Sequence, residues 1–422
     1  FLIYNLAMGN RPGTMDEFAN VRVRGYVADD KLALLARQNN IQGKTGYKLG
    51  LTASADSTGI NIKLTPYKPV IAYKDWTINS DNFIHLDIAR RHFDANLDMA
   101  GAGSRVRLYT EHSDSVATQE DVILKITDLQ LADWLAMSPF APPVKGTVSS
   151  DMRFGWDESS LTGSGTVSLD DLVYGRERVG SFDLGVGLST SAAGVIRADA
   201  SLLVDSVKVI TACGSLNDST SATPFNLDFS MIHLPLRILN PFLPADMARL
   251  SGMLNGEMDI TGDLAHPVFN GYIDFDSTAV RVPMMGTDFR FSDNKVPVVD
   301  NVVTFDNYTI KAVNDKPLYI NGTVAFRDIA APQMDLSLKA DNMQIVGNKR
   351  GRGADIYGKA FINADATVRG TMALMIIDAD LSLLRGTNVT YVMSTDASTA
   401  ITSRSSGDMV RFVNFSDSLA MA

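Results

Sequence analysis

The sequence predicts an all-β protein: an elongated, curled β-sheet groove (β-taco-like) of many short strands, with an apolar concave face and a few short helices. Short runs alternate apolar and polar residues along most of the 422 residues, which is the period of a strand with one apolar face. These runs recur every 8 to 15 residues or so, as in an all-β chain. Little else in the chain is available to cover the apolar face.

Composition sets the outer limits of the interpretation. A chain with 45% hydrophobic and 20% charged residues is ordinary for a folded protein. Its net charge of −10 argues against a nucleic-acid partner, because phosphate neutralisation needs clustered Lys and Arg. Cys213 is the single cysteine, which excludes an intrachain disulfide and a thiolate metal cluster, and we expect it to be a small buried or half-buried side chain.

The sequence lacks the common motifs of enzymes and metal sites. The five histidines are scattered without the spacing of a zinc site, and the chain has no nucleophile elbow or phosphate-binding loop. We therefore predict no enzyme activity, no catalytic or metal-binding residue and no cofactor. No run reaches the roughly 18 apolar residues that span a bilayer. The chain begins at Phe1, so we expect a piece of a longer protein whose N-terminal anchor is missing.

Residues 1–120 are predicted to form an N-terminal β-groove segment. A short helical turn is expected at 15–19, where a few residues have a helical period. Four runs then have the alternation of strands, and turn residues separate them. These expected strands are residues 21–27, 47–53, 60–64 and 83–88.

Residues 121–225 are predicted to be a first repeat unit, a short helix plus strands, and residues 226–422 a further β-groove segment. In each, a strand (122–126; 225–230) leads into an apolar, proline-broken segment that we expect to be helical (129–137; 234–250). Pro139 and Pro241 are 102 residues apart, which suggests a duplicated unit of about 100 residues. The remaining expected strands include residues 165–169, 182–188, 302–305, 360–368 and 389–393.

The clearest alternation runs from residue 250 to residue 346. Its apolar residues would share one face of the sheet, and an open groove of this size would exceed the few hundred Å² that soluble monomers usually expose. Asn-Gly pairs at residues 255–256, 270–271 and 321–322 indicate either turns or sites of bulging and close packing. The groove candidates are Leu254, Met258, Ile260, Ile273, Phe275, Ile320, Val324, Phe326, Met334, Leu336 and Leu338.

The order of motifs along most of the chain carries a family resemblance. It resembles the C-terminal region of the TamB proteins, a translocation and assembly module subunit of the AsmA-like family, and covers about residues 122–415. The residues that carry it are Leu234-x-Leu236-x-x-Leu239-x-Pro241-Phe242, Leu250-x-Gly252-x-Leu254-x-Gly256-x-Met258-x-Ile260-x-Gly262, Pro267-x-x-x-Gly271-x-Ile273, Val282-Pro283, the runs 319–324, 336–342 and 356–360, and Val368-Arg369-Gly370.

The resemblance implies a periplasmic protein that is anchored in the inner membrane and reaches the outer membrane. It implies an outer-membrane barrel of the TamA type as partner, phospholipid acyl chains as cargo, and roles in phospholipid transport, in outer-membrane protein and autotransporter assembly, and in secretion. The alternative is an extracellular β-solenoid or β-sandwich adhesin or glycan-binding protein. A solenoid would need stacked rungs with a period of roughly 20 to 25 residues, and the three tryptophans show no regular spacing.

Overall fold

The computed structural model describes residues 2–3 and 21–392, except 29, 41, 58, 88–91, 113–119, 136–141, 157–159, 192, 218–222, 245–246, 264, 329, 351–355 and 372. About three quarters of these residues lie in strands, which confirms the predicted fold class. The strands are β1 (Leu2–Ile3), β2 (Val21–Ala28), β3 (Lys31–Asn39), β4 (Thr45–Ala55), β5 (Ile60–Ile71), β6 (Lys74–Ile78), β7 (Phe83–Asp87), β8 (His92–Gly101), β9 (Ser104–His112), β10 (Glu120–Gln130), β11 (Val144–Trp156), β12 (Leu161–Tyr174), β13 (Glu177–Thr190), β14 (Ile196–Val204), β15 (Val207–Leu216), β16 (Phe225–Pro235), β17 (Arg249–Gly262), β18 (Pro267–Val282), β19 (Thr287–Phe291), β20 (Val296–Val299), β21 (Val302–Lys311), β22 (Pro317–Ala325), β23 (Gln333–Val346), β24 (Ile356–Thr371), β25 (Met375–Leu383) and β26 (Asn388–Tyr391).

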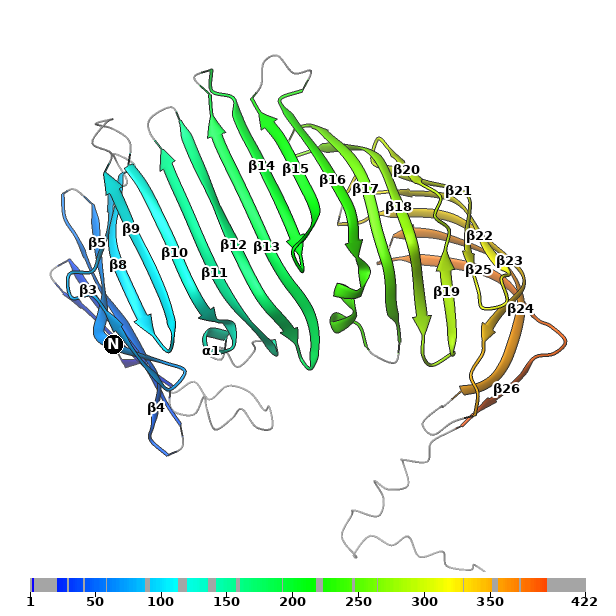
Figure 1. The fold of residues 1–422 in the computed structure, drawn as a ribbon, viewed down its shortest axis with the longest axis horizontal. Helices are drawn as coiled ribbons and strands as arrows, with labels where there is room; N and C mark the ends of the chain where they lie inside the picture. The colour runs from blue at the N-terminus through cyan, green and yellow to red at the C-terminus, as the bar shows by residue number, and fades with distance from the viewer. Residues whose placement is uncertain are drawn as a thin grey trace, which may run out of the picture.

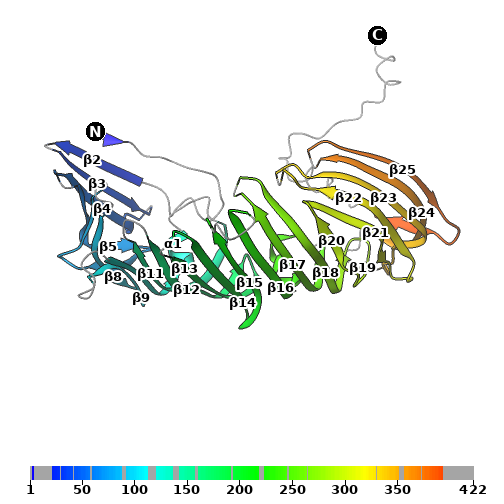
Figure 2. The same ribbon diagram turned by 90° about the horizontal axis from the view of Figure 1, so that it is seen from above.

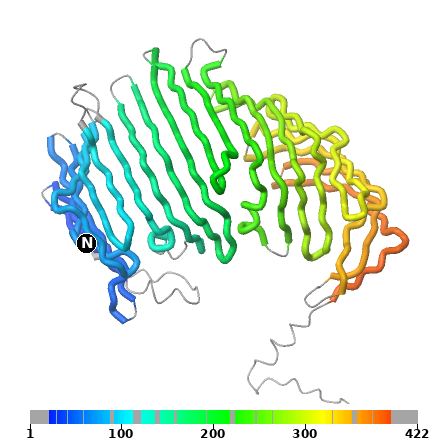
Figure 3. Tube along the Cα trace, viewed as in Figure 1, coloured from blue at the N-terminus to red at the C-terminus, as the bar shows by residue number. Residues whose placement is uncertain are grey.

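The strands pair antiparallel, mostly in the order of the sequence. Figure 1 shows them side by side across the molecule, and the tube in Figure 3 follows the same meander. The two ends of the sheet rise on the same side of the middle strands, so the sheet has one concave and one convex face (Figure 2). It continues through residues 120 and 225. The proposed division of the chain at these residues stays a prediction.

Many strands are longer than the predicted runs, because a bulge lets a strand continue past a point where the alternation of apolar and polar residues is interrupted. In β10 the apolar side follows Val122, Leu124 and Ile126, and the pairing register then shifts before Leu129. Between them Asp128 has a φ of 50°. A bulge inserts one extra residue, bends the strand and increases its twist. The apolar face is therefore kept, although the two-residue period is broken.

The same arrangement recurs in other strands. At six bulges a residue with positive φ donates its N–H to a side-chain oxygen on the following strand or, for Asp293, just after it: Asp128 to Ser149 (3.2 Å), Asp171 to Ser181 (3.0 Å), His233 to Asn255 (2.6 Å), Ser277 to Asp293 (3.2 Å), Asn307 to Asn321 (2.8 Å) and Asn342 to Asn363 (2.9 Å). The extra N–H is thereby satisfied.

Asn255, Asn270 and Asn321, the asparagines of the three Asn-Gly pairs, lie within β17, β18 and β22, so the turn interpretation is wrong and the close-packing one holds. Each accepts a hydrogen bond from a residue with positive φ, the donor to Asn270 being Asp300 (2.9 Å). Gly322 has a φ of 121°, and a Cβ there would lie 2.1 Å from a carbonyl oxygen of β23.

The helices are shorter than expected. The segment 129–137 contains α1 (Leu131–Leu135), since its first two residues belong to β10. The segment 234–250 contains a 3₁₀ helix, η1 (Leu236–Phe242), while its ends belong to β16 and β17. Pro241 inside η1 has no N–H to extend an α-helical ladder. Pro139 and the expected turn at 15–19 lie outside the described residues.

The convex face is polar, and facing strands pair opposite charges across it. Arg105 contacts Asp98 (2.5 Å), and Lys125 contacts Asp151 (3.0 Å). Cys213 lies on this face, directly opposite Asp199 and Asp228, and is exposed. The expectation of a buried or half-buried cysteine is wrong, because the alternation of β15 places this residue on the solvated side.

Candidate functional site

The candidate site is the concave face, whose apolar residues form continuous rows across the strands. Residues directly opposite each other in an antiparallel pair share one face of a sheet. One such row, the central row, crosses 17 strands from β8 to β25 through Leu97, Leu108, Leu124, Met152, Gly165, Val186, Ala200, Ala212, Phe229, Met258, Gly271, Val298, Val303, Val324, Met334, Gly370 and Met375. None of these residues is polar.

The candidate residues fall on these rows. Met258, Val324 and Met334 belong to the central row. Seven others pair on either side of it: Leu254 with Phe275, Ile260 with Phe269, Ile273 with Val296, Ile320 with Leu338, and Leu336 with Gly322. The remaining candidate, Phe326, follows β22 and packs on Phe269. All eleven candidates are partly exposed, and none is buried. A closed core would have buried them.

Aromatic rings gather on the concave side of the sheet between β18 and β22. Phe269 of β18 and Phe326, which follows β22, have ring centroids 5.5 Å apart although two strands separate them in the sheet. Phe275 lies 5.2 Å from Phe291 and 6.2 Å from Tyr308. Two of the candidates, Phe275 and Phe326, therefore line a narrow part of the groove and contact other rings of the chain.

Tyr308 shows how enclosed this part is. Its hydroxyl donates to the carbonyl oxygen of Ser292 (2.7 Å), and only 4% of the residue is exposed. Burial, with the nearby carboxylates of Asp293 and Asp274, raises the pKa of Tyr308 above its usual value. The phenol therefore stays neutral and contributes a ring to the groove wall.

Helix α1 covers part of the apolar face, which the sequence did not suggest. Trp134 of α1 packs edge to face on Trp76 of β6, with 5.7 Å between centroids. Leu97 and Met99 are buried in the same cluster. The helix is fixed by Lys74, whose Nζ contacts Asp133 at 2.8 Å, and by Tyr47, whose hydroxyl donates to the Asp133 carbonyl oxygen at 3.1 Å. Helix α1 therefore covers the apolar face of the sheet at this point.

An ion pair joins helix η1 to the turn between β14 and β15, and a second ion pair lies beside the helix. Arg237 of η1 contacts Asp205 of that turn at 2.7 Å, and Arg249 of β17 contacts Glu177 of β13 at 2.6 Å. The Arg237 guanidinium, assisted by the amide of Ser181, holds the pKa of Asp205 down at about 2. Phe242 adds a ring contact to Tyr174 at 4.8 Å. Like α1, η1 follows a strand whose bulge residue has positive φ, and Asp128 and His233 are 105 residues apart.

The groove is also hollow where β2–β5 form it. A cavity of about 420 Å³ there is lined mostly by apolar residues of these strands, together with Arg37 and Gln38. Gln38 is 3% exposed, and neither atom of its amide has a hydrogen-bond partner. A buried amide without partners costs free energy. This site was missed from the sequence, where Gln38 breaks an apolar run without a recognisable motif.

Other kinds of site are not evident in the part of the chain that the structure describes. No group of three or more His, Cys, Asp or Glu residues lies close enough to hold a metal ion. Within the same residues, neither helix has the length or apolar character needed to traverse a bilayer. The concave face is the feature that bears on function.

Fold and site together define a class: a single-sheet, antiparallel β-groove protein with an apolar concave face. Residues 306–419 match the family model described as the TamB C-terminal domain. This part of the chain is therefore a TamB C-terminal region, as the resemblance suggested, and the resemblance over residues 122–305 stays a prediction. Curated proteins and solved structures give no match to the chain.

Proposed function

We propose that this chain is a section of a TamB-type bridge whose concave face carries phospholipid acyl chains through the periplasm between the inner and outer membranes. The observation that carries the proposal is the central row, which is apolar in every strand from β8 to β25 that it crosses. Such a row gives an acyl chain an unbroken apolar contact along the sheet, and each methylene removed from water contributes about 0.8 kcal/mol.

The other parts of the proposal concern the lipid headgroup, the partners and a role in assembly. A phospholipid would lie with its acyl chains on the concave face and its headgroup at the open side, since burying a charged headgroup is costly. A barrel of the TamA type at the outer membrane and an N-terminal anchor in the inner membrane are the proposed partners. Assistance to outer-membrane protein and autotransporter assembly is part of the proposal. The protein acts as a carrier and not as an enzyme.

Neighbouring residues on opposite faces give a matched test. Ile320 points into the groove and Tyr319, which is 43% exposed, points to the convex face opposite Lys339. Ile320→Asp should lower the amount of phospholipid that copurifies with the folded chain several-fold, whereas Tyr319→Asp should leave it unchanged. Mass spectrometry of extracted lipid measures both. Equal lipid in the two variants would contradict the proposal, and unfolding of Ile320→Asp alone would show that this position is core.

The structure does not favour the solenoid or sandwich alternative. The pairs of the described strands are antiparallel and connect one sheet, whereas a β-solenoid stacks parallel rungs and a sandwich needs a second facing sheet. The adhesin function is therefore not proposed for this chain.

A further inference from the structure

The convex face of β2–β4 carries a concentration of positive charge. Residues 21–71 contain eight Lys and Arg against three Asp, although the whole chain has a net charge of −10. Arg22, Arg37 and Lys48 lie directly opposite one another on β2, β3 and β4. Like charges directly opposite each other across strands are destabilising. An arrangement of three such cations suggests that an anion compensates them.

This row differs from the cross-strand pairs of opposite charge found elsewhere on the convex face. In other strands, lysines such as Lys125 and Lys339 face aspartates on the adjacent strand. By contrast, no carboxylate among the described residues pairs with Arg22, Arg37 or Lys48. The three cations are therefore available to an external ligand.

The three arginines of this region also line one cavity. Arg22, Arg24 and Arg37, together with Leu35 and Asn39, surround a space of about 120 Å³. The Arg37 guanidinium is already held in place, since it donates to Asn39 Oδ1 (3.0 Å) and Thr45 Oγ1 (2.8 Å). A water needs only about 10 to 15 Å³ of such space, so a tetrahedral oxyanion fits. Guanidinium groups bind phosphate oxygens in a bidentate, charge-assisted manner.

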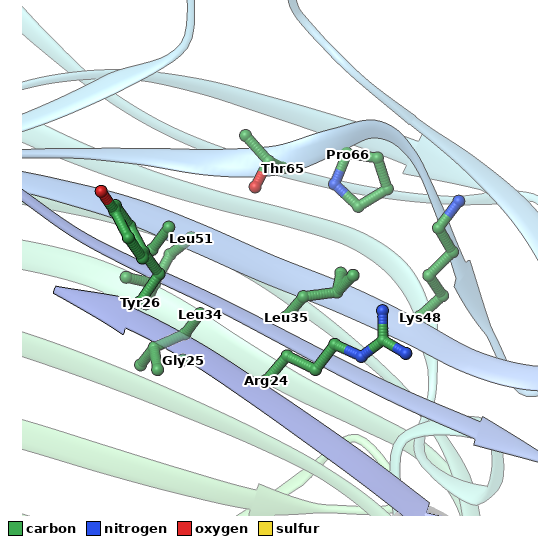
Figure 4. A pocket seen from close by; sticks show the side chains of 10 residues that line it. Arg24, Gly25, Tyr26, Leu34, Leu35, Lys48, Leu51, Thr65 and Pro66 are labelled. Carbon is green, nitrogen blue, oxygen red and sulfur yellow. The ribbon is translucent and has the colours of Figure 1, made fainter. Parts of the chain in front are cut away.

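An apolar cavity continues from this cationic one. It measures about 360 Å³, shares Arg24 and Leu35 with the first, and is lined further by Tyr26, Ala33 and Pro66. Figure 4 shows Arg24 and Lys48 at one end of it and Tyr26 at the other. Tyr26 is 65% exposed. A cationic site that opens onto an apolar one fits an amphiphile with a phosphate group and does not favour a purely polar anion.

We propose that the convex face of β2–β4 binds the headgroup of an anionic phospholipid, with the phosphate among Arg22, Arg24 and Arg37 and the glycerol ester against Leu35 and Tyr26. This site is separate from the groove, which uses the opposite face of the same strands. It would hold this end of the sheet against an anionic membrane surface, which attracts basic residues.

The test compares charge-matched variants of the whole chain. Arg22→Gln with Arg37→Gln removes two cations of the site, and Arg197→Gln, at an exposed position of β14 on the same face, with Lys208→Gln on β15 removes two elsewhere. Flotation with vesicles of phosphatidylcholine containing phosphatidylglycerol should show at least a tenfold loss of binding for the first pair and little change for the second. Binding should also weaken with salt. Equal loss for both pairs, or no loss for either, would overturn the site.

Two further measurements separate the possible ligands and functions. Calorimetry with inorganic phosphate and with a soluble short-chain phosphatidic acid should show tighter binding of the amphiphile, and equal binding of the two would overturn the lipid assignment. Ile320→Asp should bind vesicles normally even where it loses groove lipid, so the two proposals can fail separately. Arg22→Gln alone removes like-charge repulsion and leaves the hydrogen bonds of Arg37 intact, so its melting temperature should not fall. A lower melting temperature would refute the repulsion argument.

Discussion

A single carboxylate in the central row should obstruct transport along the groove. Leu124 of β10 and Val324 of β22 are members of this row, separated by many strands. A hydrated carboxylate at either position forces an acyl chain off the floor over about one strand spacing, or roughly four methylenes. At about 0.8 kcal/mol per methylene, the barrier rises by about 3 kcal/mol. Transfer should therefore slow by about 100-fold in Leu124→Asp or in Val324→Asp.

The double variant distinguishes two obstacles in series from two effects on a single rate-limiting step. Two equal obstacles along one path add their resistances, so the double variant should be only about twice as slow as either single one. Independent effects on one rate-limiting step would multiply to about 10⁴-fold, since free energies of distant sites add. Thr211→Asp, at an exposed position of the convex face, is the control and should transfer normally.

The assay is transfer of fluorescent phospholipid between donor and acceptor vesicles tethered to the two ends of the chain, with circular dichroism to confirm folding. A double variant slowed by the product of the single effects would refute the serial groove. So would two folded single variants that transfer lipid at the original rate.

Three further predictions concern the fold. The pKa of Asp205 is lowered to about 2 in the folded protein. Its ionised carboxylate therefore contributes stability above the ordinary aspartate pKa near 4, and this contribution is lost as pH falls towards 2. The carboxylate is about a quarter exposed, so screening limits the effect to about 1 kcal/mol. Asp205→Asn should lower the melting temperature at pH 6 but not at pH 2, and an equal difference at both would refute the assignment. Gly322→Ala should lower the free energy of unfolding, measured by chemical denaturation, by more than about 2 kcal/mol, because its positive φ and the facing backbone leave no room for a Cβ. The control Gly185→Ala, whose added Cβ would have its nearest contact at 3.3 Å, should lower it by less than about 1 kcal/mol. Equal losses in the two variants would contradict this. Cys213 is exposed, so a maleimide should label it equally fast in folded and urea-unfolded protein, and strong protection on folding would contradict the strand register.

Alternation alone was enough to predict which residues share the concave face. It follows from backbone geometry that residues such as Leu336 and Leu338 lie on one side, and their pairing with Gly322 and Ile320 keeps them there. The eleven candidates therefore share this face. Whether they contact lipid remains a prediction.

Features that depend on contacts distant in sequence could not be predicted. The roof over β6 and β8 requires Trp134 to meet Trp76, and nothing local to either residue indicates it. Most of the bulges could not be placed for another reason: their signal is an apolar spacing of three within a strand, as from Ile126 to Leu129, which resembles the end of a strand. The Asn-Gly pair at residues 255–256 indicated either a turn or a bulge, and the choice between them depends on the pairing of β17 with β16.

The bulges connect curvature with an uninterrupted apolar face. Without the extra residue at His233, the alternation from Met231 would place Leu234 on the convex side; with it, Leu234 pairs with Leu254 on the concave side. The same bulge also bends β16. Curvature and apolar continuity thus have one cause, and the hydrogen bond from His233 to Asn255 (2.6 Å) stabilises it. A flat sheet with the same composition would expose its apolar rows, whereas a bent one partly encloses them on its concave face.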